Sequence, residues 1–160
     1  MIKNADVTLW ILLLVYISLV FYLTIICREP SDEYKMELMP FKTIIDFFNV
    51  GYDGHGRYIL RDVLVNIGLL MPVGFVLGFH STWFKNDVCT RKTILIGFLT
   101  SLSIETLQLL SKTGTFEVDD LIYNTLGCAI GYLIICIGIL FVRVCNQRIK
   151  TEPLKINNQT

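Results

Sequence analysis

The chain has 160 residues, of which 53% are hydrophobic and 18% are charged, and its mean hydropathy is +0.57. Soluble domains contain roughly 45 to 50% apolar and about 25% charged residues, so the composition excludes an ordinary soluble domain and predicts an all-α membrane protein with several spans. Fourteen basic and fourteen acidic residues give a formal charge of zero. Nucleic acid is therefore not an expected partner.

The first candidate span, Val7 to Cys27, is a run without a single charge. At about 1.5 Å per residue it is long enough to cross a hydrocarbon core of about 30 Å. A cleaved signal peptide is the alternative, but the run exceeds the usual length of about 7 to 15 apolar residues and no small-residue cleavage site follows it. We expect a retained transmembrane helix.

A polar connection from Arg28 to Arg57 follows, and its second part carries a helical pattern of apolar residues after Pro40. The spacing predicts a short amphipathic helix that lies in the membrane interface, within the first extracellular connection. Packing of the same helix on protein is an equal alternative. The apolar residues of the pattern are Phe41, Ile44, Ile45 and Phe48.

Three more spans are predicted at about residues 58–79, 93–110 and 119–144. Pro72 interrupts the second span and predicts a kink with a freed carbonyl one turn earlier. Glycines four residues apart, Gly74 with Gly78 and Gly127 with Gly131, permit close helix approach and are the expected contacts of a homo-oligomer. Residues 1–150 thus form one transmembrane domain, and residues 151–160 form a polar tail.

The basic residues beside the spans predict the orientation. With four spans, the N-terminus, the second connection and the tail share one side of the membrane. The short second connection contains Lys85, Arg91 and Lys92. Lys and Arg are enriched in cytoplasmic flanks, so we expect a multi-pass protein of the cell membrane with both termini in the cytoplasm.

Polar side chains interrupt three of the spans, and this orientation places them all at the outer end. Ser101, Glu105 and Gln108 fall on one face of the third span, which must turn away from lipid because a carboxylate in a span costs roughly 2.5 to 3.5 kcal/mol. We expect an outward-facing polar pocket roofed by the amphipathic helix. The candidate ligand-binding residues are Arg61, Asp62, Asn66, Gln108, Asp119 and Asn124, and the candidate catalytic residues are Glu105 and Asp120.

Each candidate also has a structural interpretation. Arg61 and Asp62 can anchor the second span at the interface. One of Asp119 and Asp120 can cap the fourth span, since Asp is a preferred N-cap residue. Glu105 can pair with Arg61, because buried acids need a partner. Against these stands a role for Glu105 as an acid, a base or a contact to a polar ligand head.

No metal site, phosphate-binding loop or cofactor is expected. The cysteines are scattered, with no Cys-x-x-Cys pair and no paired histidines beside them, so we expect them to be packing residues. They are Cys27, Cys89, Cys128, Cys136 and Cys145.

Four short motifs occur in a fixed order. They are LMPF at Leu38–Phe41, RDVLVNIGLLMPVGF at Arg61–Phe75, IETLQ at Ile104–Gln108 and DDLIYNTLGCAIG at Asp119–Gly131. In order, spacing and helical context they resemble the VanZ-like family, named after an accessory protein of glycopeptide-resistance clusters in Gram-positive bacteria. Many members carry an arginine shortly after the glycine of the third connection, where this chain has Thr115 after Gly114. Lys112 or Arg61 are the expected substitutes.

The resemblance implies a cell-envelope membrane protein that lowers susceptibility to teicoplanin and related lipoglycopeptide antibiotics, and it transfers no catalytic residue. The pocket is then expected to bind membrane lipid, a lipid-linked cell-wall precursor or the drug, with Arg61 as the anion contact. Two alternatives stay open. One is a membrane enzyme that modifies a lipid or wall precursor with Glu105 and Asp120 as acid and base groups, and the other is a small proton-coupled transporter.

Overall fold

The computed structural model describes residues 2–50, 54–85 and 90–156. Within these residues, four helices are long and apolar enough to cross a membrane, which confirms the predicted all-α membrane fold. In chain order the elements are α1 (Ile2–Phe21) with a π-helical turn (Tyr22–Ile26), β1 (Lys35–Glu37), α2 (Lys42–Val50), α3 (Gly54–Phe79) with a second π-helical turn (His80–Lys85), α4 (Thr90–Ser111), β2 (Thr115–Glu117) and α5 (Val118–Ile156).

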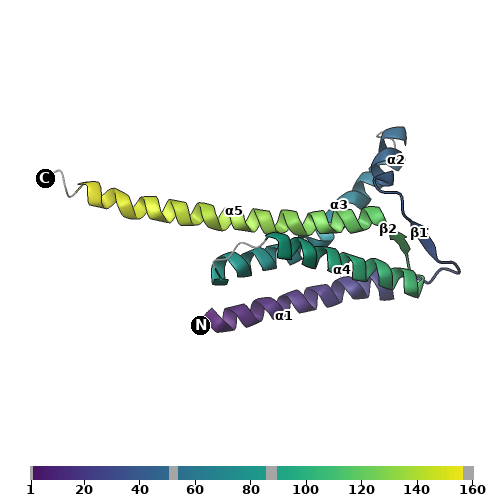
Figure 1. Ribbon diagram of the computed structural model, residues 1–160, viewed down its shortest axis with the longest axis horizontal. Helices are drawn as coiled ribbons and strands as arrows, with labels where there is room; N and C mark the ends of the chain where they lie inside the picture. The colour runs from purple at the N-terminus through teal and green to yellow at the C-terminus, as the bar shows by residue number, and fades with distance from the viewer. Residues whose placement is uncertain (1, 51–53, 86–89, 157–160) are drawn as a thin grey trace.

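The two chain ends lie at the same end of the bundle. In Figure 1, the start of α1 and the C-terminal part of α5 are on the left, whereas α2, β1 and β2 are on the right. Helix α5 continues to Ile156, well past its expected end at residue 144 and through most of the region expected to be a tail. The short helix α2 and the two strands lie at the end of the bundle remote from both termini.

Helices α3 and α5 form the most extensive helix pair, and glycines allow their close approach. A Cβ at Gly74 would collide with the carbonyl of Cys128, and a Cβ at Gly127 would collide with that of Ile67. Gly131 is equally close to the carbonyl of Met71, and Gly78 faces Tyr132 and Ile135. The glycines thus serve contacts within one chain, and association of two copies through them stays a prediction.

Helix α1 packs at the side of this pair. Leu13 and Val20 are buried against the core, and the Tyr16 hydroxyl donates to the Leu69 carbonyl at 2.7 Å. The carbonyl that loses its donor at Pro72 is that of Gly68, four residues earlier, so Tyr16 binds the neighbouring carbonyl in the same turn. Helix α3 continues through Pro72.

The polar stripe of α4 faces inward, as predicted. Ser101, Glu105 and Gln108 are at most 5% exposed. Many apolar side chains of the spans remain exposed instead, such as Leu14 and Phe141. This distribution is the one expected for helices that face lipid, since lipid accepts apolar surface and excludes carboxylates.

A small parallel sheet of β1 and β2 was not predicted. Met36 pairs with Phe116, and Glu37 pairs with Glu117. Strands of three residues are too short to show the two-residue alternation by which strands are identified in a sequence. The sheet ties the first connection to the turn before α5, and the Ser31 amide adds a hydrogen bond to the Lys112 carbonyl at 2.7 Å.

We expect Gly127→Ala to destabilise the chain by about 1 to 3 kcal/mol, because the added methyl group meets backbone and forces α3 and α5 apart. Gly138→Ala is the matched control on α5, since its Cβ would have nothing within 4 Å. The control should be neutral or slightly stabilised, as alanine favours helix. Thermal unfolding in detergent measures both, and equal midpoints would contradict the packing role.

Candidate functional site

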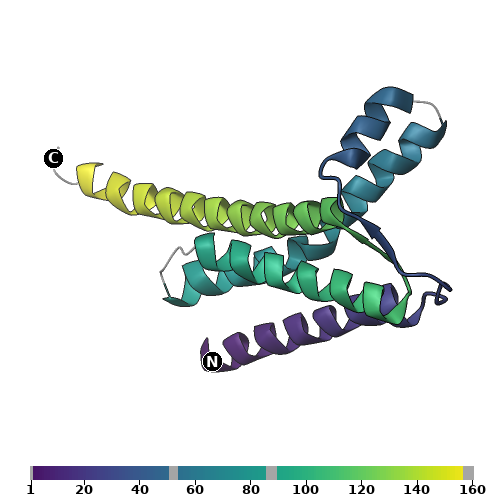
Figure 2. The same cartoon turned by 45° about the vertical axis from the view of Figure 1, so that its right-hand side comes forward.

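A polar pocket of about 350 Å³ lies at the end of the bundle remote from the termini. Helix α2 runs beside the first part of α3, away from α1 and α4 (Figure 2), and covers the pocket. The predicted roof helix is therefore in place. The lining residues are Glu37, Lys42, Thr43, Asp46, Ile59, Asp62, Val63, Asn66, Thr115, Glu117, Asp119, Asp120 and Tyr123.

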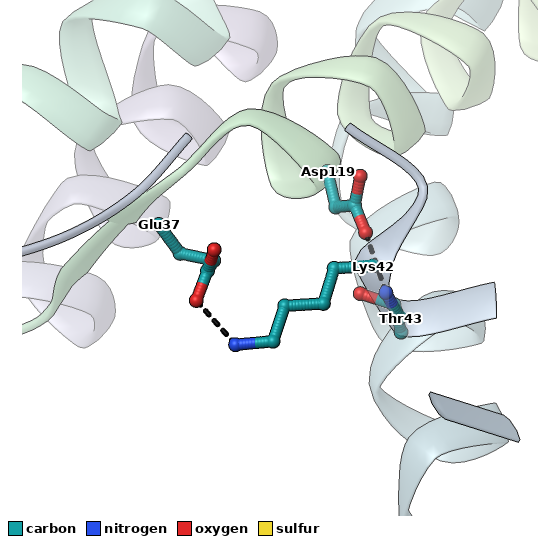
Figure 3. A network of polar contacts seen from close by, with 4 residues as sticks. All are labelled: Glu37, Lys42, Thr43 and Asp119. Carbon is teal, nitrogen blue, oxygen red and sulfur yellow. Dashed lines mark hydrogen bonds and ion pairs between the residues drawn. The ribbon is translucent and has the colours of Figure 1, made fainter. Parts of the chain in front are cut away.

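The roof is held by a carboxylate from another element. The Ile45 amide donates to the Phe41 carbonyl at 3.0 Å, so Phe41 is the N-cap residue of α2 and has no side-chain oxygen to accept the free amides of the first turn. Asp119 supplies both acceptors. Its Oδ1 accepts the Phe41 amide at 2.5 Å. Its Oδ2 accepts the Thr43 amide at 2.8 Å (Figure 3).

This contact also fixes an unusual backbone conformation. Phe41 has φ of 61°, a left-handed conformation that a bulky residue rarely adopts and that costs about 1 to 3 kcal/mol. The buried Asp119 carboxylate holds the strained residue through its amide. Helix α5 already begins at Val118, so both Asp119 and Asp120 lie inside its first turn, and the expectation that one of them is its N-cap is wrong. Asp119 caps α2 instead.

Two glutamates lie side by side in the short sheet. Glu37 forms an ion pair with Lys42 of α2 (Figure 3), and this hydrogen bond lowers the pKa of Glu37 and raises that of Lys42. Burial raises the pKa of Glu117, and the negative charges of Asp119 and Glu37 raise it further. The positive charge of Lys42 thus offsets the charge of Glu37 more than that of Glu117.

The far wall comes from α3 and α5. The Asn66 amide group donates to Asp120, and Asp62 lies one turn earlier on α3. The pocket is consequently acidic, with six carboxylates and one ammonium group among its lining residues.

Glu105 and Asn124 belong to a separate buried layer between α4 and α5. Glu105 is 2% exposed, and its carboxylate accepts the Glu117 amide at 3.2 Å. Asn124 donates to the Ser101 hydroxyl at 3.1 Å. Neither Glu105 nor Asn124 lines the pocket. Their hydrogen bonds tie β2 and α5 to α4, and the side-chain oxygen of Asn124 has no hydrogen-bond partner among the described residues.

Arg61 and Lys112 were the expected substitutes for the arginine of many family members, but neither lies beside the buried acids. Arg61 lies with Arg57 on an exposed surface of α3, and among the described residues it forms no ion pair with Glu105, so that expected pairing was wrong. The Lys112 ammonium donates to the Asp32 carbonyl at 3.1 Å and lies 4.7 Å from the centre of the Tyr34 ring.

Arg28 takes that position instead. A Cβ on Gly114 would lie 3.2 Å from the Arg28 guanidinium and 3.3 Å from the Gln108 side-chain oxygen. The charge of Arg28 also acts on the carboxylates of Glu105 and Asp120. Gln108 itself turns toward the end of α1, where it donates to the Thr24 carbonyl at 3.4 Å.

The structure therefore divides the predicted site. Four candidates line the pocket, namely Asp62, Asn66, Asp119 and Asp120. The other four, Glu105, Gln108, Asn124 and Arg61, lie outside it.

Sequence reasoning missed much of the lining. The polar face of the predicted amphipathic helix was the available signal for Lys42 and Asp46. Glu37, Glu117 and Tyr123 gave none, because they reach the pocket through the unpredicted sheet and the tertiary packing of α5.

Asp119→Asn should loosen the roof, since an amide side chain accepts through one oxygen only. Hydrogen bonds to a charged group are worth roughly 1.5 to 3 kcal/mol, so hydrogen exchange of the α2 amides should accelerate about tenfold or more. Asp46→Asn makes the same chemical change in the same pocket without an amide contact and should leave exchange unchanged. Equal exchange in both variants would contradict the capping role.

Glu117→Gln should raise the thermal midpoint at neutral pH. The raised pKa means that folding favours the protonated carboxyl, so ionisation of Glu117 destabilises the fold as the pH rises and glutamine removes that penalty. The gain should shrink below the ordinary glutamate pKa of about 4.3. The exposed Glu29→Gln serves as control, and a gain that is independent of pH would refute the assignment.

Comparison with known proteins agrees with the motifs. The profile of the VanZ/LLP1 family matches residues 8–141. No match was found among the curated proteins or the solved structures compared with the chain. The matched region extends from the first span into the last and includes every residue of the pocket, and the chain belongs to the VanZ/LLP1 family.

Proposed function

We propose that the chain binds the polar head of a lipid-tailed envelope molecule in its acidic pocket and thereby lowers susceptibility to teicoplanin and related lipoglycopeptide antibiotics. The molecule is a lipid-linked cell-wall intermediate, a lipid or the drug itself. Membership of the VanZ/LLP1 family supports the envelope role, and the chemistry of the roof supports the lipid tail.

The observation that carries the proposal is the two-sided roof helix. One face of α2 lines the pocket with Lys42, Thr43 and Asp46. Its apolar residues point the other way, and Phe48 is 77% exposed. Exposed apolar surface of this kind is stabilised when it lies in the boundary between headgroups and acyl chains. A pocket beneath such a helix sits at the depth of a lipid head.

The direction of the pocket follows from the charge pattern. The pocket is at the end of the bundle opposite the chain ends (Figure 1). Lys85 ends the π-helical turn after α3, and Arg91 and Lys92 lie in the first turn of α4, on the side of the termini. These basic residues favour the cytoplasm for that side. The pocket then faces outward, where lipid-linked wall intermediates are displayed.

Binding has more support than acid–base catalysis. Asp120 lines the pocket, but Glu105 does not, and its carboxylate already accepts a backbone amide. The two proposed catalytic groups therefore do not face one cavity. Arg61 is also outside the pocket, so the anion contact expected of it is no longer part of the proposal.

Expression of the chain in a sensitive Gram-positive host should raise the minimum inhibitory concentration of teicoplanin more than that of vancomycin. Asp62→Asn should weaken this protection, because one charged hydrogen bond is worth roughly 1.5 to 3 kcal/mol, or about tenfold or more in occupancy. Glu29→Gln, outside the pocket, should protect as the unchanged chain does.

All proteins are compared at matched membrane levels. Unchanged susceptibility with the unsubstituted chain would rule out the resistance role. Full protection by Asp62→Asn together with Asp46→Asn would show that the pocket is not where the protein acts.

A further inference from the structure

The pocket contains negative charge that the described chain does not neutralise. Three of its carboxylates have partners: Glu37 pairs with Lys42, Asp119 accepts two amides, and Asp120 accepts from Asn66. The other three form no hydrogen bond or ion pair through their carboxylates with any described residue. They are Asp46, Asp62 and Glu117, and they come from α2, α3 and β2.

A second, independent group in the pocket is also unsatisfied. Tyr123 of α5 lines the pocket and is 5% exposed. Its buried hydroxyl lies beside the Thr43 side chain but forms no hydrogen bond of normal geometry with any described residue. A buried hydroxyl without a partner costs about 1 to 3 kcal/mol. The three acids and the hydroxyl therefore come from four elements around one cavity. The acids have no partner among the described residues, and the hydroxyl has only Thr43 beside it.

The arrangement suits an organic cation better than a metal ion or an anion. No group of three acids, histidines or cysteines in the described residues stands close enough to hold a metal ion. An anion would be repelled by the lining carboxylates. An ammonium group, by contrast, has a positive charge and three N–H donors that point in different directions.

The protein already places one ammonium group at this pocket. Lys42 reaches Glu37 along the rim, which shows that the acidic wall accommodates such a group. The charge of Lys42 offsets that of Glu117 only in part, and the pKa of Glu117 stays raised by burial and by the charges of Asp119 and Glu37. Space for a second ammonium group remains within about 350 Å³.

We propose that the pocket selects molecules whose polar head carries a primary ammonium group, bound by Asp46, Asp62 and Glu117, with the Tyr123 hydroxyl as a further hydrogen-bond acceptor. The inference rests on the proposed function, since it specifies the head of the lipid-tailed molecule. The same carboxylates that bind the cation disfavour lipids with only phosphate heads.

The test uses the purified full chain in a neutral maltoside detergent and isothermal titration calorimetry. The probes are hexylammonium, hexan-1-ol and hexanoate, which share one alkyl chain and differ in charge. Hexylammonium should bind, and the other two probes should bind at least about tenfold more weakly. The alcohol has one donor and no positive charge, and the acids repel the carboxylate of hexanoate.

Four variants assign the binding to this pocket. Asp62→Asn, Glu117→Gln and Tyr123→Phe should each weaken hexylammonium binding, the two acid replacements by about tenfold. Glu29→Gln should bind as the unchanged chain does. Size-exclusion profiles and thermal midpoints confirm folding, and Asp46→Asn replaces any variant that fails to fold.

The outcomes separate this inference from the proposed function. Equal binding of all three probes, or unchanged hexylammonium binding in the acid variants, would overturn the amine selectivity. If hexan-1-ol binding depends on Tyr123, the pocket binds ligands without a preference for amines, and the inference is overturned. Selective amine binding together with unchanged teicoplanin susceptibility would support the inference and reject the resistance role.

Discussion

The carboxylate of Asp119 is the contact on which the pocket depends. It joins two motifs that lie 78 residues apart, LMPF before α2 and DDLIYN at the start of α5. Without it, the first amides of α2 would lack acceptors and the left-handed Phe41 would lose the hydrogen bond that holds it. Helix α2 contributes Lys42, Thr43 and Asp46 to the lining of the pocket. The contacts of Asp119 therefore hold these three side chains in place.

A second constraint acts below the pocket, because polar groups of segments that cross a hydrocarbon core must find partners within the protein. The chain meets it by using backbone amides as partners for acids: Glu105 accepts the Glu117 amide as Asp119 accepts those of α2. Glycines on α3 and α5 bring the two helices into backbone contact, so that Asn66 of one helix reaches Asp120 of the other. The polar end of the bundle is thus built on a tightly packed helix pair.

The spans, the inward stripe of α4 and the roof helix could be predicted because each leaves a periodic pattern within one segment. Ser101, Glu105 and Gln108 recur at helical spacing, and lipid excludes that face. The position of Arg28 could not be predicted, since it reaches Gly114 only after the first connection is tied down by a sheet with three-residue strands. The same limit applies to Asp119, which looked like the cap of its own helix. Its partners are close in space and distant in sequence, and no local pattern encodes such a pair.

The carboxylates of the two polar layers differ in the partners that the chain gives them. Glu105 lies in a dry interior, where an unpaired charge would be costly, and accepts a backbone amide. Asp46, Asp62 and Glu117 line an open cavity, where water or a ligand can solvate them, and the fold supplies no partner from its described residues. Burial beside Asp119 and Glu37 still raises the pKa of Glu117, which means that negative charge in the cavity is in excess. A cation that enters the cavity would reduce the repulsion among these carboxylates. Its binding would therefore stabilise the folded protein at the place where ionised Glu117 destabilises it.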